Sequence, residues 1–181
     1  MGYGRLELQY AEPFAEALVN DAAFKTWVLW QTEFSNFADD ARLLHQEMKE
    51  RRSAVSKYWW RSHFTEACRC LGCSGKETDL LAIFETGIGF RFALHVEIKH
   101  PGDKFKNDGV QATGYPIRAQ CWVTKSPANV LPHHQATTVL LFSAKKLADY
   151  AAHLPHFKTL ITFEDIERHF PNASARTGSA Y

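Results

Sequence analysis

The stretch ETDLLAIFETGIGFRFALHVEIK, residues 77–99, decides the fold, because it has the pattern of two β-strands joined by a tight turn. A strand that covers a core shows apolar side chains on one face and polar ones on the other. This stretch nevertheless carries Asp79, Glu97 and Lys99 within a markedly hydrophobic run. Where these three charges lie is the first question that the sequence raises.

Successive side chains of a strand point to opposite faces, so the second strand, predicted over residues 90–99, divides into two sets. Its even positions are all apolar: Phe, Phe, Leu, Val and Ile. Its odd positions are Arg91, Ala93, His95, Glu97 and Lys99. We expect the odd positions to form a polar surface on which Glu97 and Lys99 lie side by side.

The turn Gly87-Ile88-Gly89 predicts which residues face each other, because glycine in the third place of a three-residue loop suits the left-handed conformation found there. Such a loop places Asp79 directly across from Glu97. Cross-strand Cβ atoms are about 4.5 to 5.5 Å apart, and like charges at that range destabilise a sheet. We therefore expect Lys99 and a bound cation to neutralise the two acids.

Two carboxylates, the backbone carbonyl of Ile98 and waters form the hard oxygen ligand set that Mg²⁺ prefers, with Mn²⁺ as an alternative. The cation would polarise a phosphate group and acidify a water. Lys99 would orient that water, stabilise developing charge or act as the base. These parts predict phosphodiester hydrolysis. The competing interpretation is a solvated strand face with an ordinary Glu97–Lys99 ion pair.

Length and composition indicate one globular domain over residues 1–170, followed by a flexible tail at 171–181. The formal net charge of +1 gives no global attraction to nucleic acid, so binding of DNA would depend on a local positive rim. The residues proposed for this rim are Arg91, Lys104, Lys106 and Arg118. No apolar run reaches the roughly 18 residues that span a bilayer, and the N-terminus lacks a signal-peptide core. We expect a cytoplasmic protein without membrane contact.

The rest of the chain predicts helices and strands around this hairpin. Residues 11–56 have helical spacing, and the aromatic run 56–64 suits a strand. Further predicted elements are helices over 110–122, 145–151 and 164–170 and strands over 136–143 and 158–163. We therefore expect an α/β fold with a mixed central sheet flanked by helices and with a helical N-terminal region.

Asp79, the tripeptide Glu97-Ile98-Lys99 after a hairpin, and then Gln111 and Tyr115 resemble the PD-(D/E)XK nuclease superfamily. The resemblance implies a restriction-endonuclease-like α-β-β-β-α-β core, which residues 33–143 would cover. It also implies a Mg²⁺-dependent nuclease that hydrolyses DNA, in which Asp79 and Glu97 bind the metal and Lys99 serves the attacking water. Gln111 and Tyr115, at positions i and i+4 of one helix, would flank the site.

The same resemblance implies an accessory metal ligand on the helix before the first strand. Glu33 is the best match, with Glu47 and Glu50 as alternatives. Thr78 stands where the family name has proline. Pro116 removes a backbone hydrogen bond from any helix that contains it, so the predicted helix either kinks or begins there.

Two other interpretations stay open. The first is a nucleic-acid-binding or protein-interaction module that has the nuclease fold but does not cleave. The second is a protein in which Cys68, Cys70, Cys73 and Cys121 hold zinc or an iron–sulfur cluster, although their spacing is not that of an established ligand set. Endonuclease and exonuclease action, DNA and RNA substrates, and a monomer and a homodimer are not distinguished by the sequence.

Overall fold

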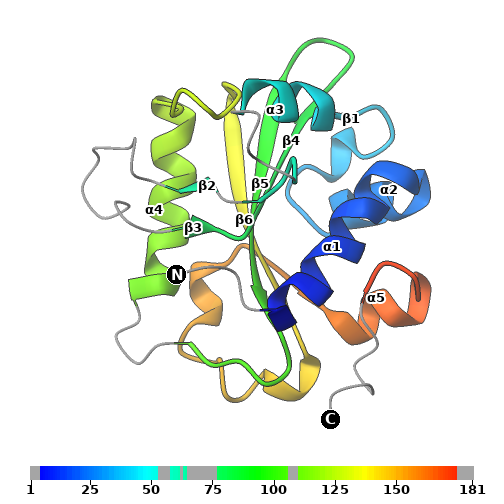
Figure 1. Ribbon diagram of the computed structural model, residues 1–181, viewed down its shortest axis with the longest axis vertical. Coiled ribbons are helices and arrows are strands. Elements are labelled where there is room, and N and C mark those ends of the chain that lie inside the picture. Colours follow the sequence, from blue (N-terminus) through cyan, green and yellow to red (C-terminus); the bar gives the residue numbers. More distant parts are fainter. Residues whose placement is uncertain (1–4, 53–57, 62, 65–76, 106–109, 175–181) are drawn as a thin grey trace.

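The stretch 77–99 contributes the centre of a five-stranded mixed sheet in the computed structural model, which describes residues 5–52, 58–61, 63–64, 77–105 and 110–174 (Figure 1). The strand order is β1-β4-β5-β6-β7, in which β1, β4 and β5 are antiparallel neighbours and β6 and β7 run parallel to β5. The strands are β1 Arg42–Leu43, β4 Leu80–Glu85, β5 Arg91–Lys99, β6 Gln135–Phe142 and β7 Thr159–Thr162. The fold is α/β, as predicted.

Helices cover both faces of this sheet (Figure 1). In the described ranges they are α1 Arg5–Asn20, α2 Ala22–Trp30, α3 His45–Arg51, α4 Val110–Thr124 and α5 Phe163–His169. α1, α2 and α5 lie on one side, whereas α4, which connects the parallel strands β5 and β6, lies on the other. Side-chain caps fix two of the helix starts: the Asp21 carboxylate accepts the Phe24 N–H at 3.0 Å, and the Thr162 hydroxyl accepts the Asp165 N–H at 3.1 Å.

The even face of β5 packs as predicted, and the odd face does not form a polar surface. Phe92, Leu94, Val96 and Ile98 enter the core with α1 and α2. The odd residues from position 93 onward are also buried, because α4 and the segment between α4 and β6 cover this face of the sheet. Only Arg91, at the start of the strand, is partly exposed. The interpretation of a solvated Glu97–Lys99 ion pair is therefore wrong.

The predicted hairpin register is confirmed. Leu80 pairs with Val96 and Glu85 with Arg91, and Gly89 has a φ of 78°, in the region that favours glycine. The first strand, expected over residues 79–86, is two residues shorter, because Asp79 lies in a bend between β4 and the short strand β3, Glu77–Thr78, and Thr86 lies at the turn. β3 pairs with β2, His63–Phe64, in a separate two-stranded sheet.

α4 passes through Pro116 without ending there. Pro116 lies on the solvent-facing side of the helix. Because proline has no N–H, the carbonyl four residues before it loses its intrahelical partner. The helix does not begin at this proline. Gln111 and Tyr115 consequently lie on one continuous helix.

The helical N-terminal region is confirmed, but residues 11–56 are not one uninterrupted helical segment. The run ARLLHQEM contains the edge strand β1 before α3 begins, because Leu43 pairs with Phe84 and adds to the sheet. The first strand of the antiparallel part is therefore β1 rather than residues 56–64. Of the described residues in that predicted strand, 58–61 and 63–64, only His63–Phe64 form a strand.

One further expectation, the helix over residues 145–151, differs from the structure. Residues 145–151 form a 3₁₀ turn, Ala144–Lys146, and further turns rather than an α-helix. Of the predicted tail, residues 171–174 are described, and Ala173 and Ser174 are buried against the fold. Cys68, Cys70 and Cys73 lie outside the described residues, whereas Cys121 is half-buried on α4. Within the described ranges, no helix has both the length and the apolar character that crossing a bilayer requires.

Candidate functional site

Asp79 and Glu97 come together at the end of the hairpin remote from its turn. The register that pairs Leu80 with Val96 sets Asp79 opposite Glu97. One Asp79 carboxylate oxygen accepts the backbone N–H of Ile98 at 2.8 Å, which fixes the side chain against β5. Asp79 is half-buried, whereas Glu97 is completely buried. The two predicted acids therefore share one place, with Asp79 on the side open to solvent.

Lys99 joins this pair with all of its donors engaged. Its ammonium group lies 2.9 Å from Glu97 Oε1, 3.2 Å from Gln111 Oε1 and 3.2 Å from Asp103 Oδ2. The Phe105 ring closes another side, with its centroid 5.0 Å from Nζ. An ammonium group has three N–H donors, so these three acceptors saturate Lys99.

Gln111 and Tyr115 bring α4 into the same group. The Gln111 amide donates to Glu97 Oε1 at 2.6 Å while its oxygen accepts from Lys99, so one side chain bridges the acid and the base. The Tyr115 hydroxyl accepts the Asp79 backbone N–H at 3.2 Å and lies 3.4 Å from the Val96 carbonyl, to which it donates. Tyr115 is completely buried and therefore forms the floor of the site.

The neighbouring acids of this group shift the pKa values of its members. Burial and the adjacent Glu97 raise the pKa of Asp79 well above its ordinary value, although the Ile98 N–H and Lys99 act in the opposite direction. Burial and the charges of Asp79 and Glu97 likewise raise the pKa of Tyr115. For Lys99, burial alone would lower the pKa, but the charges of Glu97 and Asp103 outweigh it and raise the pKa. Lys99 is thus held as a cation.

The donor set fits a hard divalent cation. Glu97 Oε2 is buried and makes no hydrogen bond of good geometry with any described residue, which leaves a carboxylate oxygen available beside Asp79. The N–H and C=O of one strand residue point to the same side, so the Ile98 carbonyl faces the side on which Asp79 lies. Asp79, Glu97 and the Ile98 carbonyl would hold the ion, as the sequence predicts. In the described part of the chain, no group of three or more acidic, histidine or cysteine side chains is placed to hold a metal ion.

Glu33 is not brought to this group. It is exposed in the turn that follows α2, and the next residue, Phe34, stacks on Phe92 with ring centroids 4.2 Å apart. Phe92 lies on the opposite face of β5 from Glu97 and near the other end of the strand. The alternatives Glu47 and Glu50 lie on α3, where Glu47 pairs with Arg42 at 2.6 Å.

The structure adds two acids that the sequence analysis did not select. Asp103, on the loop after β5, binds Lys99 directly. Glu77, on β3, has a pKa raised to about 7 by burial and by Glu7 and Glu97, with Arg61 acting in the opposite direction. Asp103 follows Lys99 by four residues, and Glu77 precedes Asp79 by two in strand-like sequence. These two spacings are the only features of the sequence that could have indicated that Asp103 and Glu77 lie near the site.

The proposed positive rim is not assembled as expected. Arg118 is completely buried, donates to the Thr78 hydroxyl at 2.7 Å and lies over the Tyr115 ring. Arg91 pairs with Glu85 at the other end of the hairpin. Lys104 is exposed, and Lys106 lies outside the described residues. Thr78 thus serves as an acceptor for Arg118.

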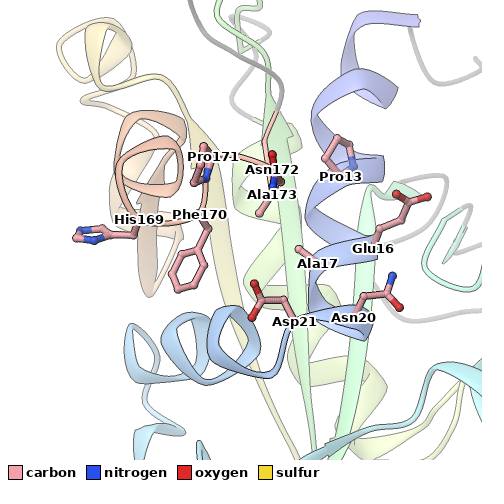
Figure 2. Close-up of a pocket in the computed structure, with 10 residues that line it drawn as sticks. All are labelled: Pro13, Glu16, Ala17, Asn20, Asp21, His169, Phe170, Pro171, Asn172 and Ala173. Atoms are coloured by element: carbon pink, nitrogen blue, oxygen red, sulfur yellow. The ribbon is translucent and has the colours of Figure 1, made fainter.

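A separate pocket of about 370 Å³ lies between α1 and the chain segment that follows α5 (Figure 2). Its lining residues are Pro13, Glu16, Ala17, Asn20, Asp21, His169, Phe170, Pro171, Asn172 and Ala173. It belongs to the helices on the face of the sheet opposite α4. No residue of the Asp79–Glu97–Lys99 group lines it, so the two features are independent.

The geometry thus brings together Asp79, Glu97, Ile98, Lys99, Gln111 and Tyr115 and leaves Glu33 apart. Comparison of the chain with protein-family models, with curated proteins and with solved structures found no match.

Proposed function

We propose that this protein is a metal-dependent nuclease of restriction-endonuclease-like fold that hydrolyses phosphodiester bonds in DNA. The observation that carries the proposal is the convergence of Asp79 and Glu97 with Lys99 at hydrogen-bond distance from Glu97. Two buried acids that are both ionised beside each other are unfavourable unless cations balance both charges, and Lys99 supplies only one positive charge. A divalent ion bound between the acids is the simplest source of the rest.

The order of the elements supports the same proposal. A helical region precedes the antiparallel strands β1, β4 and β5, after which α4 leads into the parallel strand β6. With α3 and the short strands β2 and β3 inserted between β1 and β4, this order accommodates the α-β-β-β-α-β succession that the resemblance implies. Glu97 and Lys99 lie on β5 and Asp79 lies in the bend directly before β4, where the resemblance expects them.

Each side chain has a distinct task in this proposal. A Mg²⁺ or Mn²⁺ ion, when bound, supplies Lewis-acid polarisation of a phosphate group and lowers the pKa of a water. Asp79 and Glu97 provide its carboxylate ligands. Lys99 remains protonated and stabilises negative charge on the phosphate oxygens. Gln111 holds Glu97 and Lys99 at a fixed separation, and Tyr115 holds Asp79 against β5.

The second candidate function is a module of the same fold that binds nucleic acid or protein without cleaving. The observation that favours it is the saturation of Lys99 by Glu97, Gln111 and Asp103, which leaves no ammonium donor for a substrate. A polar cluster of this kind also fixes the position of α4 on the sheet. The two candidate functions differ in whether a bound cation leads to cleavage of the nucleic acid.

Cleavage assays separate the two functions. The purified protein is incubated with circular and linear duplex DNA, single-stranded DNA and RNA, each with Mg²⁺, Mn²⁺ or a chelator. We expect cleavage of DNA with either metal, loss of cleavage with the chelator, and a decrease of at least about 100-fold in Asp79→Asn and Lys99→Met. Glu85→Gln is the matched control, because it removes an acid from the same hairpin outside the site. Nucleic-acid binding without cleavage, unchanged by metal and by both variants, would establish the module instead.

A further inference from the structure

Of the three partners of Lys99, Asp103 is the one that an incoming ligand can displace most readily. Glu97 and Gln111 are bound to each other at 2.6 Å and come from β5 and α4, so they and Lys99 form a closed triangle. Asp103 comes from the loop that follows β5, and its side chain is 24% exposed, against 0% for Glu97 and 4% for Lys99. Asp103 therefore occupies the solvent-facing donor of the ammonium group.

The loop presents this carboxylate in a defined position. The backbone N–H of Asp103 donates to the His100 carbonyl at 2.8 Å, which closes a turn directly after β5. The Tyr150 hydroxyl donates to the Asp103 carbonyl at 2.8 Å, and Asp103 Oδ1 accepts the Lys104 N–H at 2.8 Å. Only Oδ2 is directed to Lys99. The Phe105 ring, which lies on another side of Nζ, offers no acceptor that could replace it.

A phosphate group that approached Lys99 would meet Asp103 first. Glu97 is completely buried, and Gln111, half-buried like Asp103, is held by its hydrogen bond to Glu97, so the donor that now binds Asp103 is the one that an external anion can reach. A phosphate oxygen and a carboxylate oxygen accept the same N–H geometry, and both carry negative charge. They exclude each other at this position, because three acceptors already saturate the ammonium group.

We propose that the Asp103 carboxylate occupies the subsite at which Lys99 receives a phosphate oxygen of the nucleic acid, and that binding of the substrate displaces it. This inference rests on the phosphate-facing role of Lys99 in the proposed function, but it does not require cleavage. Asp103 acts through Lys99 and is a positioning residue. Its removal opens the subsite, because the competing acceptor loses its charge.

The test is anion binding in the absence of metal. Inorganic phosphate and a short fluorescent DNA duplex are titrated separately into chelator-treated protein, by NMR for phosphate and by fluorescence anisotropy for the duplex. In Asp103→Asn we expect about threefold to tenfold tighter binding of both probes, since a competing ion pair of this exposure is worth little more than that. Asparagine retains the acceptor for the Lys104 N–H, so the loop is expected to fold, and a melting curve checks this.

Asp149→Asn is the matched control for charge. Asp149 also influences the pKa of Tyr150, as Asp103 does, but its ion pair is with Lys146 at 2.8 Å and not with Lys99. We expect no tighter binding in this variant. An equal gain in Asp149→Asn would show that only the overall field had changed and would overturn the inference, as would the absence of a gain in Asp103→Asn.

Two further variants locate the effect at Lys99. Tyr150→Phe releases the backbone of Asp103 without removing its charge, so we expect a smaller gain in the same direction. Asp103→Asn combined with Lys99→Gln should lose the gain, and a gain that persists in the double variant contradicts the proposed subsite.

Tighter binding of phosphate but not of the duplex in Asp103→Asn would also overturn the proposed subsite. A protein that cleaves DNA but shows no Asp103 effect refutes this inference alone, and one that shows the effect without cleavage refutes only the proposed nuclease activity.

Discussion

The two ends of the β4–β5 hairpin solve the same pairing problem differently. Near the turn, Glu85 faces Arg91, and the two side chains form a 2.6 Å ion pair that is partly exposed. At the other end, the same register sets Asp79 opposite Glu97, so like charges face each other. Lys99, which lies beside Glu97 on β5, is the only described side-chain cation in direct contact with either acid.

This difference separates a structural ion pair from a candidate site. Water screens the Glu85–Arg91 pair, so its presence and its loss have little effect on stability. At the Asp79 end, α4 excludes water from Glu97 and Lys99, so each charge depends on its neighbours. The protein retains an excess of acid in a buried place, where apolar residues would be more stable. We attribute that excess to function.

The largest expected effect is the loss of Lys99. Lys99→Met leaves Glu97 buried without its cation, and we expect the free energy of unfolding to decrease by about 3 to 5 kcal/mol. Arg91→Met removes the corresponding cation at the exposed end and should decrease it by less than about 1 kcal/mol. Urea denaturation of both variants in chelator measures the difference. Equal losses would show that burial does not distinguish the two ends.

The second expectation concerns a bound cation. Mg²⁺ at roughly 30 times its dissociation constant should stabilise the folded protein by about 2 kcal/mol, and Asp79→Asn should abolish this gain. Glu85→Gln, which neutralises an acid at the other end, should leave the gain intact. Thermal denaturation with and without Mg²⁺ provides the readout. A gain that survives in Asp79→Asn would place the ion elsewhere.

The third expectation is a pH dependence at the acid-rich end. The pKa of Glu77 is raised from 4.5 to about 7, mainly by burial, so between these values the folded state binds a proton that the unfolded state has lost. Stability in chelator should therefore decrease as pH rises from 4.5 through 7, and Asp79, whose pKa is also raised, acts in the same direction. We expect Glu77 to contribute about 1 kcal/mol to this decrease in the free energy of unfolding, because Glu77 is partly exposed and water weakens its interactions.

Two variants check this assignment by denaturation across the pH range. Glu77→Gln should flatten the decrease. Glu85→Gln should not, since the hydrogen bond to Arg91 lowers the pKa of Glu85 and its contribution has the opposite sign. An unchanged slope in Glu77→Gln would assign the dependence to other groups.

The smallest expected effect is that of the Tyr115 hydroxyl. Tyr115→Phe removes the acceptor of the Asp79 N–H, and we expect a loss of about 0.5 to 1 kcal/mol in the free energy of unfolding. Thr86→Val removes a comparable acceptor near the turn, where the hydroxyl binds the Phe90 N–H at 3.2 Å, and we expect the smaller loss there. A loss in Thr86→Val larger than in Tyr115→Phe would contradict the assignment of Tyr115 as the floor of the site.

Much of the site could be predicted because it depends on local rules. The glycine at position 89 and the alternation along β5 were sufficient to set Asp79 opposite Glu97, and a spacing of four residues placed Gln111 and Tyr115 on one face of α4. Glu33 could not be located in this way, since its position depends on where the chain turns after α2. Asp103 also escaped prediction, because a loop residue has no periodicity that indicates its direction.

The sequence by itself determined the hairpin, its register and the identity of the charged residues, because turn geometry and side-chain alternation act between neighbours a few residues apart. Only the tertiary structure decided that the charged face of β5 is buried. That burial requires α4 to return across the sheet and the loop after β5 to bring Asp103 to Lys99. Burial and pairing between distant segments arise from packing of the whole chain, which no local pattern encodes.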